Sequence, residues 1–272
     1  MNKRGQVTIF IIVAILIVIL VIMFFFIRKQ VKPEIGQKTQ GDPQSFLESC
    51  LENKVQDKIK LISSQGGYVE NSLSKSVDGV NISYLCYTQN NYIPCTNQEP
   101  VLIDHLKKEL KKATQNDIEK CFSSLRQSFE DKSYQVTLGN LDFNFDLQSK
   151  KVILNIKRDL QLSKNNENSQ YDHFDIIFSN RLYDLAVVVQ EITSQEARFC
   201  HFDTSGYMTF YPQYNIEEFT LGDSTKIYSV KDKKTNEQFV FLIRSCVIPP
   251  GIGWIDMEYL YTIKPYIFHK QY

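Results

Sequence analysis

The sequence predicts an α+β fold that follows an N-terminal transmembrane helix. An uncharged apolar run fills residues 7–27, helical spacing of apolar residues dominates residues 43–131, and alternation with period two dominates residues 132–272. Helices grouped early and antiparallel strands grouped late are typical of α+β proteins. We therefore expect a leader (1–6), a membrane helix (7–27), a stalk (28–42), a helix-rich subdomain (43–131) and a β-rich subdomain (132–272).

The apolar run has the length of a membrane span. Its 21 residues contain no charge, glycine or proline, and as a helix they reach roughly 31 Å, the thickness of the hydrocarbon core. A cleaved signal has a shorter apolar core followed by small residues, whereas this run ends in three phenylalanines and Ile27 and is followed by Arg28. We expect a permanent single-pass anchor in the lipid bilayer. Basic residues flank both ends, so the positive-inside rule gives only a weak orientation.

The first helix after the stalk is predicted to begin at Asp42-Pro43. An aspartate cap followed by proline in the first turn favours a helix start. Gly66 and Gly67 are expected to end this helix. Its apolar residues recur at helical spacing: Leu47, Leu51, Val55, Ile59 and Ile62.

Two further helices are predicted before residue 131. One spans 101–112. The other starts near Asn116, with Glu119 in the capping-box position. The apolar face of the second is formed by Ile118, Cys121, Phe122, Leu125 and Phe129.

The later part of the chain alternates polar and apolar residues, which predicts half-buried strands. Strands are expected at 141–147, 152–156, 174–178, 206–211, 225–231 and 238–245, the last two joined by a hairpin around 232–237. Residues 163–171 are predicted to be a polar loop, and 180–196 an amphipathic helix. The aromatic tail, 254–272, is expected to pack on the domain.

The distribution of charge argues against nucleic acid as a partner. Lys plus Arg and Asp plus Glu both number 31, but four of the basic residues flank the apolar run. From residue 30 onward 27 basic residues face 31 acidic ones, a net charge of −4. A slightly acidic domain without a basic block is not expected to bind nucleic acid.

The six cysteines predict disulfides. They are Cys50, Cys86, Cys95, Cys121, Cys200 and Cys246. Their spacings do not fit a zinc site, and an even number on an exported domain favours disulfides over free buried thiols. Fifteen pairings are possible. A hairpin would close Cys86 with Cys95, packed helices could join Cys50 with Cys121, and Cys200 and Cys246 remain.

The sequence contains no catalytic, cofactor or metal motif. His173 lies between two acids but faces solvent in a predicted strand. Cys200 and His201 are adjacent, and adjacent residues of an extended segment point to opposite faces, which disfavours a thiol nucleophile. We therefore expect a protein that is not an enzyme and needs no cofactor.

A loop rich in tyrosine and asparagine is the candidate recognition surface. It contains Tyr87, Asn90, Asn91 and Tyr92, between Cys86 and Cys95. Tyrosine gives contact area at low entropic cost and asparagine gives adaptable hydrogen bonds. An ordinary polar hairpin is the alternative. Just before it, Asn81-Ile82-Ser83 forms a glycosylation sequon, usable only outside the cell.

Lys3-Arg4-Gly5-Gln6 and the apolar helix after it resemble the class III signal of archaeal type IV pilin-like proteins. The resemblance implies that a prepilin-type peptidase cuts between Gly5 and Gln6 and leaves the helix on the mature chain. It also places Phe10 where pilins usually carry a glutamate that assists filament assembly.

A second resemblance covers Phe46-Leu47-Glu48-Ser49-Cys50-Leu51-Glu52 and Gln65-Gly66-Gly67-Tyr68, followed by a helix ending near Cys121. This layout is similar to single-pass surface proteins of archaea with small genomes, and implies a domain outside the cell.

Together these features predict a single-pass protein of the cell membrane with an extracellular C-terminal domain. Its expected role is that of a pilin-like or surface-contact component, with lateral self-association or other surface proteins as partners. The alternatives are a pilin polymerised into a filament and a membrane-anchored enzyme of unrecognised type.

Overall fold

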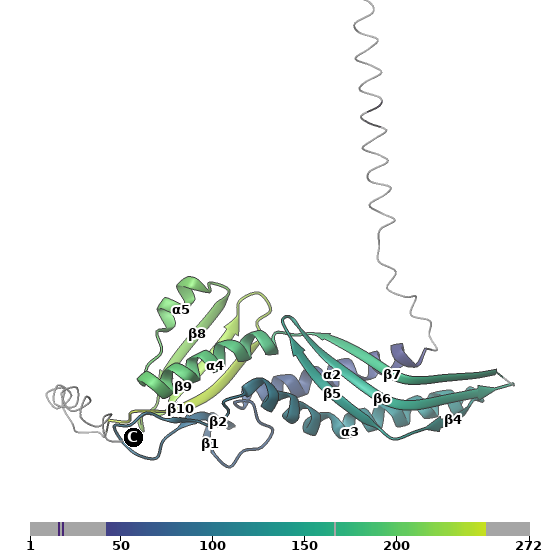
Figure 1. Cartoon of the computed structure of the whole chain (residues 1–272), viewed down its shortest axis with the longest axis horizontal. Coiled ribbons are helices and arrows are strands. Elements are labelled where there is room, and N and C mark those ends of the chain that lie inside the picture. Colours follow the sequence, from purple (N-terminus) through teal and green to yellow (C-terminus); the bar gives the residue numbers. More distant parts are fainter. Residues whose placement is uncertain (1–15, 17, 19–41, 166, 249–272) are drawn as a thin grey trace, which may run out of the picture. The chain divides into compact units, whose positions relative to one another are not determined.

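The computed structural model describes residues 42–165 and 167–248, together with Leu16 and Val18 (Figure 1). The described residues from Phe46 onward belong to one compact unit. Its first two long helices precede most of the strands, and its two sheets are largely antiparallel. The predicted α+β class is confirmed for this unit.

Within the described ranges, no helix has both the length and the apolar composition required to cross a bilayer. The predicted anchor, residues 7–27, lies outside these ranges apart from Leu16 and Val18. The leader, most of the stalk and the aromatic tail lie outside them too.

Helix α2 (Pro43–Ser64) begins and ends where the sequence predicts. The backbone N–H of Ser45 donates to Asp42 Oδ2 at 3.2 Å, which caps the helix. All five predicted apolar residues are buried. Gly66 has a φ of +74°, and a Cβ there would lie 2.7 Å from the Ser83 carbonyl oxygen, so the turn requires glycine.

Helix α3 (Leu102–Glu130) replaces the two helices predicted for this stretch, and that prediction was wrong. The polar residues at 111–116 include no glycine or proline, so nothing breaks the helix there. Thr114 is buried inside it and donates its hydroxyl to the Leu110 carbonyl at 2.7 Å. Glu119 is therefore not part of a cap. The predicted apolar face from Ile118 to Phe129 is buried.

Four antiparallel strands form the sheet that packs on α3: β4 (Gln135–Leu138), β5 (Asp142–Gln148), β6 (Lys151–Lys164) and β7 (Glu167–Ser179). β7 pairs along the length of β6 on one edge, so β4 and β5 share the other edge. Apolar residues alternate toward the buried face, as predicted.

The predicted polar loop at 163–171 is wrong, because β6 and β7 continue through most of it. Ser163 pairs with Asn168, and Lys164 pairs with Glu167. A long hairpin can satisfy backbone groups by cross-strand hydrogen bonds without any apolar side chain. Because these residues lack apolar alternation, the sequence pattern did not predict strands there.

A β-bulge in β6 turns Arg158 toward α3. The register shifts between Lys157 and Leu160, and the Arg158 guanidinium donates to Glu119 Oε2 at 2.9 Å and to the Gly139 carbonyl at 3.1 Å. It also lies 4.8 Å from the centre of the Phe122 ring. This re-aiming of one side chain is a common effect of bulges.

The second sheet has the order β1-β2-β10-β9-β8. Its strands are β1 (Ser74–Val77), β2 (Val80–Tyr87), β8 (Tyr214–Thr220), β9 (Lys226–Asp232) and β10 (Gln238–Arg244), and the short β3 (Thr96–Asn97) pairs with β2. β2 and β10 are parallel and the other pairs are antiparallel. The sheet thus takes strands from both predicted subdomains, 43–131 and 132–272.

Two helices accompany this sheet. α4 (Leu182–Phe199) packs on β9, β10 and β2, and its apolar face of Leu182, Leu185, Val189 and Ile192 is buried. α5 (Thr204–Phe210) contacts β8 (Figure 1). The strand predicted at 206–211 is therefore wrong. Asp203 Oδ1 accepts from the Gly206 N–H at 2.9 Å, and this cap starts a helix instead. The hairpin around 232–237 is confirmed.

A smaller apolar cluster lies on the sheet face opposite α4. Ile82, Tyr84 and Leu242 form it, and the Tyr84 hydroxyl lies 3.0 Å from Thr225 Oγ1. Nearby, Lys75 of β1 forms an ion pair with Asp223 of the β8–β9 turn, with 2.6 Å between Nζ and Oδ2. The β1–β2 hairpin is thereby fastened to the turn between β8 and β9.

Candidate recognition site

The loop that joins β2 to β3 is the candidate site. Its ends are joined by the Cys86–Cys95 disulfide, whose Cα atoms lie 5.4 Å apart. Backbone pairing of Cys86 with Asn97 and of Tyr87 with Thr96 makes the connection a hairpin, as the sequence predicts. At the tip Asn90, Asn91 and Tyr92 are exposed. Tyr92 has a φ of +62°, a left-handed conformation that is uncommon for tyrosine.

Tyr87 differs from the other predicted loop residues. Its side chain is partly buried against the outer apolar cluster, with its ring 5.1 Å from that of Tyr84. The Arg244 guanidinium lies 6.0 Å from the centre of the Tyr87 ring on another side. Tyr87 therefore packs beneath the candidate loop, and its exposed tip consists of Asn90, Asn91 and Tyr92.

The loop is also bonded to the end of β10 and to the segment that follows it. The Thr88 N–H donates to the Arg244 carbonyl at 3.0 Å, and the Tyr92 N–H donates to the Val247 carbonyl at 3.0 Å. The Cys246 N–H in turn donates to the Ile93 carbonyl at 2.9 Å. The Arg244 guanidinium also donates to the Thr88 carbonyl. The loop is therefore fixed along both of its arms.

A second disulfide, Cys200–Cys246, anchors that supporting segment to the end of α4, with Cα atoms 5.7 Å apart. Cys200 ends the helix in the left-handed conformation, at a φ of +58°. Cys50 and Cys121 form the third bond, between α2 and α3. All six cysteines of the chain are thus paired, which confirms the expectation of disulfides.

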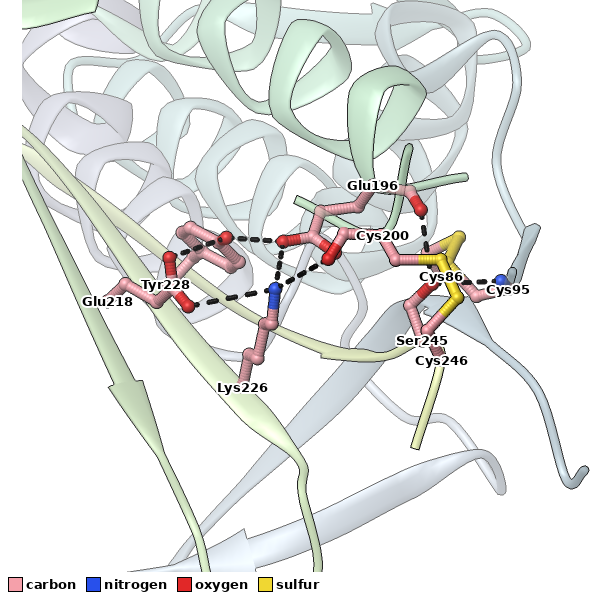
Figure 2. A network of polar contacts seen from close by, with 9 residues as sticks. All are labelled: Cys86, Cys95, Glu196, Cys200, Glu218, Lys226, Tyr228, Ser245 and Cys246. Carbon is pink, nitrogen blue, oxygen red and sulfur yellow. Dashed lines mark hydrogen bonds and ion pairs between the residues drawn. A yellow bond between two sulfur atoms is a disulfide. The ribbon is translucent and has the colours of Figure 1, made fainter. Parts of the chain in front are cut away.

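Ser245 links the recognition loop to α4 (Figure 2). Its hydroxyl oxygen accepts from the Cys95 N–H at 3.0 Å, and the hydroxyl donates to the Glu196 carbonyl at 3.1 Å. The residue is only 5% exposed. A buried hydroxyl that both accepts and donates fixes the distance between two backbones, so the loop's second cysteine has a set position relative to α4.

The side chain of Glu196 is the centre of a buried polar network (Figure 2). It is 0% exposed. Its Oε1 accepts from Lys226 Nζ at 2.6 Å and from the Tyr228 hydroxyl at 2.5 Å. Lys226 also donates to the Cys200 carbonyl at 3.1 Å. An isolated buried carboxylate would be strongly unfavourable, and the Lys226 ammonium supplies the compensating charge.

Tyr228 connects Glu196 to a second carboxylate, because its hydroxyl also lies 2.9 Å from Glu218 Oε2. Burial, together with the charges of Glu196 and Glu218, raises the pKa of Tyr228. The hydroxyl therefore keeps its proton and remains a hydrogen-bond donor to the network. Glu196 Oε2 is buried without a hydrogen-bond partner among the described residues.

The other residues considered for chemistry are not assembled into a site. His173 is exposed on β7, with its Nε2 2.9 Å from Asp175 Oδ1. His201 is exposed after α4, and Cys200 has no thiol because it is oxidised. A further histidine, His105, lies in α3 with its Nε2 2.9 Å from the Gly67 carbonyl oxygen. Among residues 42–165 and 167–248, no three potential ligands gather as a metal site would require.

The sequence interpretation missed the network, although one signal was present. Glu196 lies four residues after Ile192, on the apolar face of the amphipathic helix. A charged residue at such a position needs a buried partner. Nothing local, however, identifies Lys226 and Tyr228 as the partners.

No family model, curated protein or solved structure matches the chain.

Proposed function

We propose that the chain is a membrane-anchored extracellular surface protein that makes contacts through the loop of Asn90, Asn91 and Tyr92, and that it is not an enzyme. The observation that carries the proposal is the pairing of every cysteine. Disulfides persist in oxidising environments and are rare in the cytosol. The apolar run at 7–27 and the resemblance of residues 3–6 to a class III signal support a retained anchor.

The design of the loop supports a role in recognition. Two disulfides and several backbone hydrogen bonds hold a tip whose side chains are polar or aromatic and exposed. A surface that is ordered before binding loses less conformational entropy when a partner arrives.

The proposed membrane anchoring and extracellular location are tested on the full chain in native membranes. We expect the mature N-terminal peptide to begin at Gln6, and alkylation to modify the six cysteines only after reduction. Protease added to intact cells should digest residues beyond the stalk. Recovery of the chain from the cell interior with six reactive thiols would contradict the proposal.

The proposed role of the loop in surface contact is tested with the full chain reconstituted into phosphatidylcholine vesicles. The number of vesicles that attach to intact source cells is counted. Tyr92→Ala combined with Asn91→Ala should lower attachment at least tenfold. Tyr211→Ala is the matched control, because Tyr211 is 46% exposed against 39% for Tyr92 and lies after α5. Equal attachment by all three proteins would refute the role of the loop.

A further inference from the structure

The only Asn-x-Ser/Thr triplet of the whole chain is Asn81-Ile82-Ser83, and it lies in β2. Because alternate residues of a strand face the same side, Asn81 and Ser83 share one face and Ile82 takes the other. Ile82 is buried in the outer apolar cluster. Asn81 is exposed, and its side-chain amide has no hydrogen-bond partner among the described residues.

Asn81 borders a polar hollow of about 470 Å³. This volume is within the range of small-molecule sites, roughly 300–1,000 Å³. The lining of the hollow is dominated by amide, hydroxyl and carboxylate groups, which come from Gln65, Tyr68, Glu70, Asn71, Ser72, Ser74 and Ser83. Such groups hydrogen-bond the hydroxyls of a sugar rather than an apolar ligand.

We propose that Asn81 carries an N-linked glycan whose first sugar lies against this hollow. The inference rests on the proposed export of the domain. In the reaction, Asn81 Nδ2 forms a bond to the anomeric carbon of a polyprenyl phosphate-linked oligosaccharide. The bond from that carbon to the phosphate oxygen breaks, the lipid phosphate leaves, and a base of the transferase takes one Nδ2 proton.

The fold sets the time of the modification. Ser83 is 2% exposed, because the Gly66 turn covers it and its N–H donates to the Gln65 carbonyl at 3.1 Å. A transferase that must read the serine hydroxyl can do so only before β2 closes against this turn. The glycan is therefore added before the domain folds, and the exposed amide of Asn81 leaves room for it afterwards.

The test is mass spectrometry of the peptide containing Asn81, from the full chain expressed in its own host. We expect a glycan mass on this peptide, lost in Asn81→Gln and in Ser83→Ala but kept in Ser83→Thr. Asn71→Gln, in the same hollow but outside a sequon, should leave the glycan in place. Folded, unglycosylated protein offered to host membranes with the lipid-linked donor should stay unmodified, whereas the urea-unfolded chain should be modified.

Alkylation of the same sample distinguishes failure of the glycan proposal from failure of the proposed function. An unmodified Asn81 on a surface-exposed chain with three disulfides overturns the glycan and leaves the proposed function intact. Reduced cysteines on an intracellular chain overturn both.

Discussion

The two sheets of the molecule share one apolar core but differ in the polar groups buried beside them. Between α3 and strands β4–β7 the buried residues are almost all apolar, and the charged Arg158 reaches out to Glu119 at the margin. Between α4 and the second sheet lie Glu196, Lys226 and Tyr228. Apolar contacts are stabilising but not directional, whereas hydrogen bonds fix positions at a cost in desolvation. The interior that contains the polar network is linked to the candidate loop through Ser245, which bonds both the Glu196 carbonyl and the Cys95 N–H.

The largest expected effect concerns the apolar interior. Phe178→Ala removes a ring that is 0% exposed on β7 and should lower the free energy of unfolding by about 4 kcal/mol. Ile177→Ala, on the opposite face and 61% exposed, should cost less than about 0.5 kcal/mol. Denaturant unfolding of the full chain in detergent, followed by circular dichroism, measures both. Similar losses would mean that this sheet is covered on both faces.

The second-largest expected loss of stability concerns the polar network between α4 and the second sheet. Lys226→Met leaves the Glu196 carboxylate buried without a counter-charge and should cost about 3 kcal/mol, the low end for breaking a buried pair. Combining it with Glu196→Gln should restore most of this loss, because no charge then remains buried. The same unfolding assay applies. A double variant no more stable than Lys226→Met would show that the pair does not act as a unit.

The smallest effect concerns the ion pair between the β1–β2 hairpin and the β8–β9 turn. Burial alone would raise the pKa of Asp223, but the Lys75 ammonium and the Thr225 backbone N–H lower it below its usual value. A lowered folded-state pKa gives stability that is present above the unfolded pKa, about 3.9, and is lost as the pH falls through the folded value. Asp223→Asn should therefore cost less than about 1 kcal/mol at pH 7, and nothing once the pH lies below the folded pKa.

Measuring the stability cost of Asp223→Asn by unfolding at pH 7 and at about pH 2.5 checks the direction of this pH dependence. Because the same interaction is removed, Lys75→Met should add little to Asp223→Asn at pH 7. A cost that is larger at low pH than at pH 7 would contradict the assignment.

Much of the fold follows from local patterns, and two of the failures share one cause. The Asp42 cap, the Gly66 turn and the alternation from Phe143 to Leu147 are local signals, and the structure confirms them. Thr114 and Lys164 lie in polar stretches that favour breaks. There, backbone pairing or a partner element overrides side-chain polarity. The loop at 87–92 was identified from composition. Ser245, which bonds the Cys95 N–H from 150 residues away, and Lys226, which bonds Glu196, had no local signature.

The parallel pairing of β2 with β10 has a consequence for biosynthesis. The loop's bonds to Arg244, Cys246 and Val247 span more than 150 residues of sequence. The ribosome synthesises the loop long before the residues that bond to it. The loop therefore cannot adopt its final conformation until almost the entire domain has been synthesised. A product truncated before Arg244 would still contain Asn90, Asn91 and Tyr92 but would leave them without their frame. The loop would thus reach its folded conformation only on a completed chain.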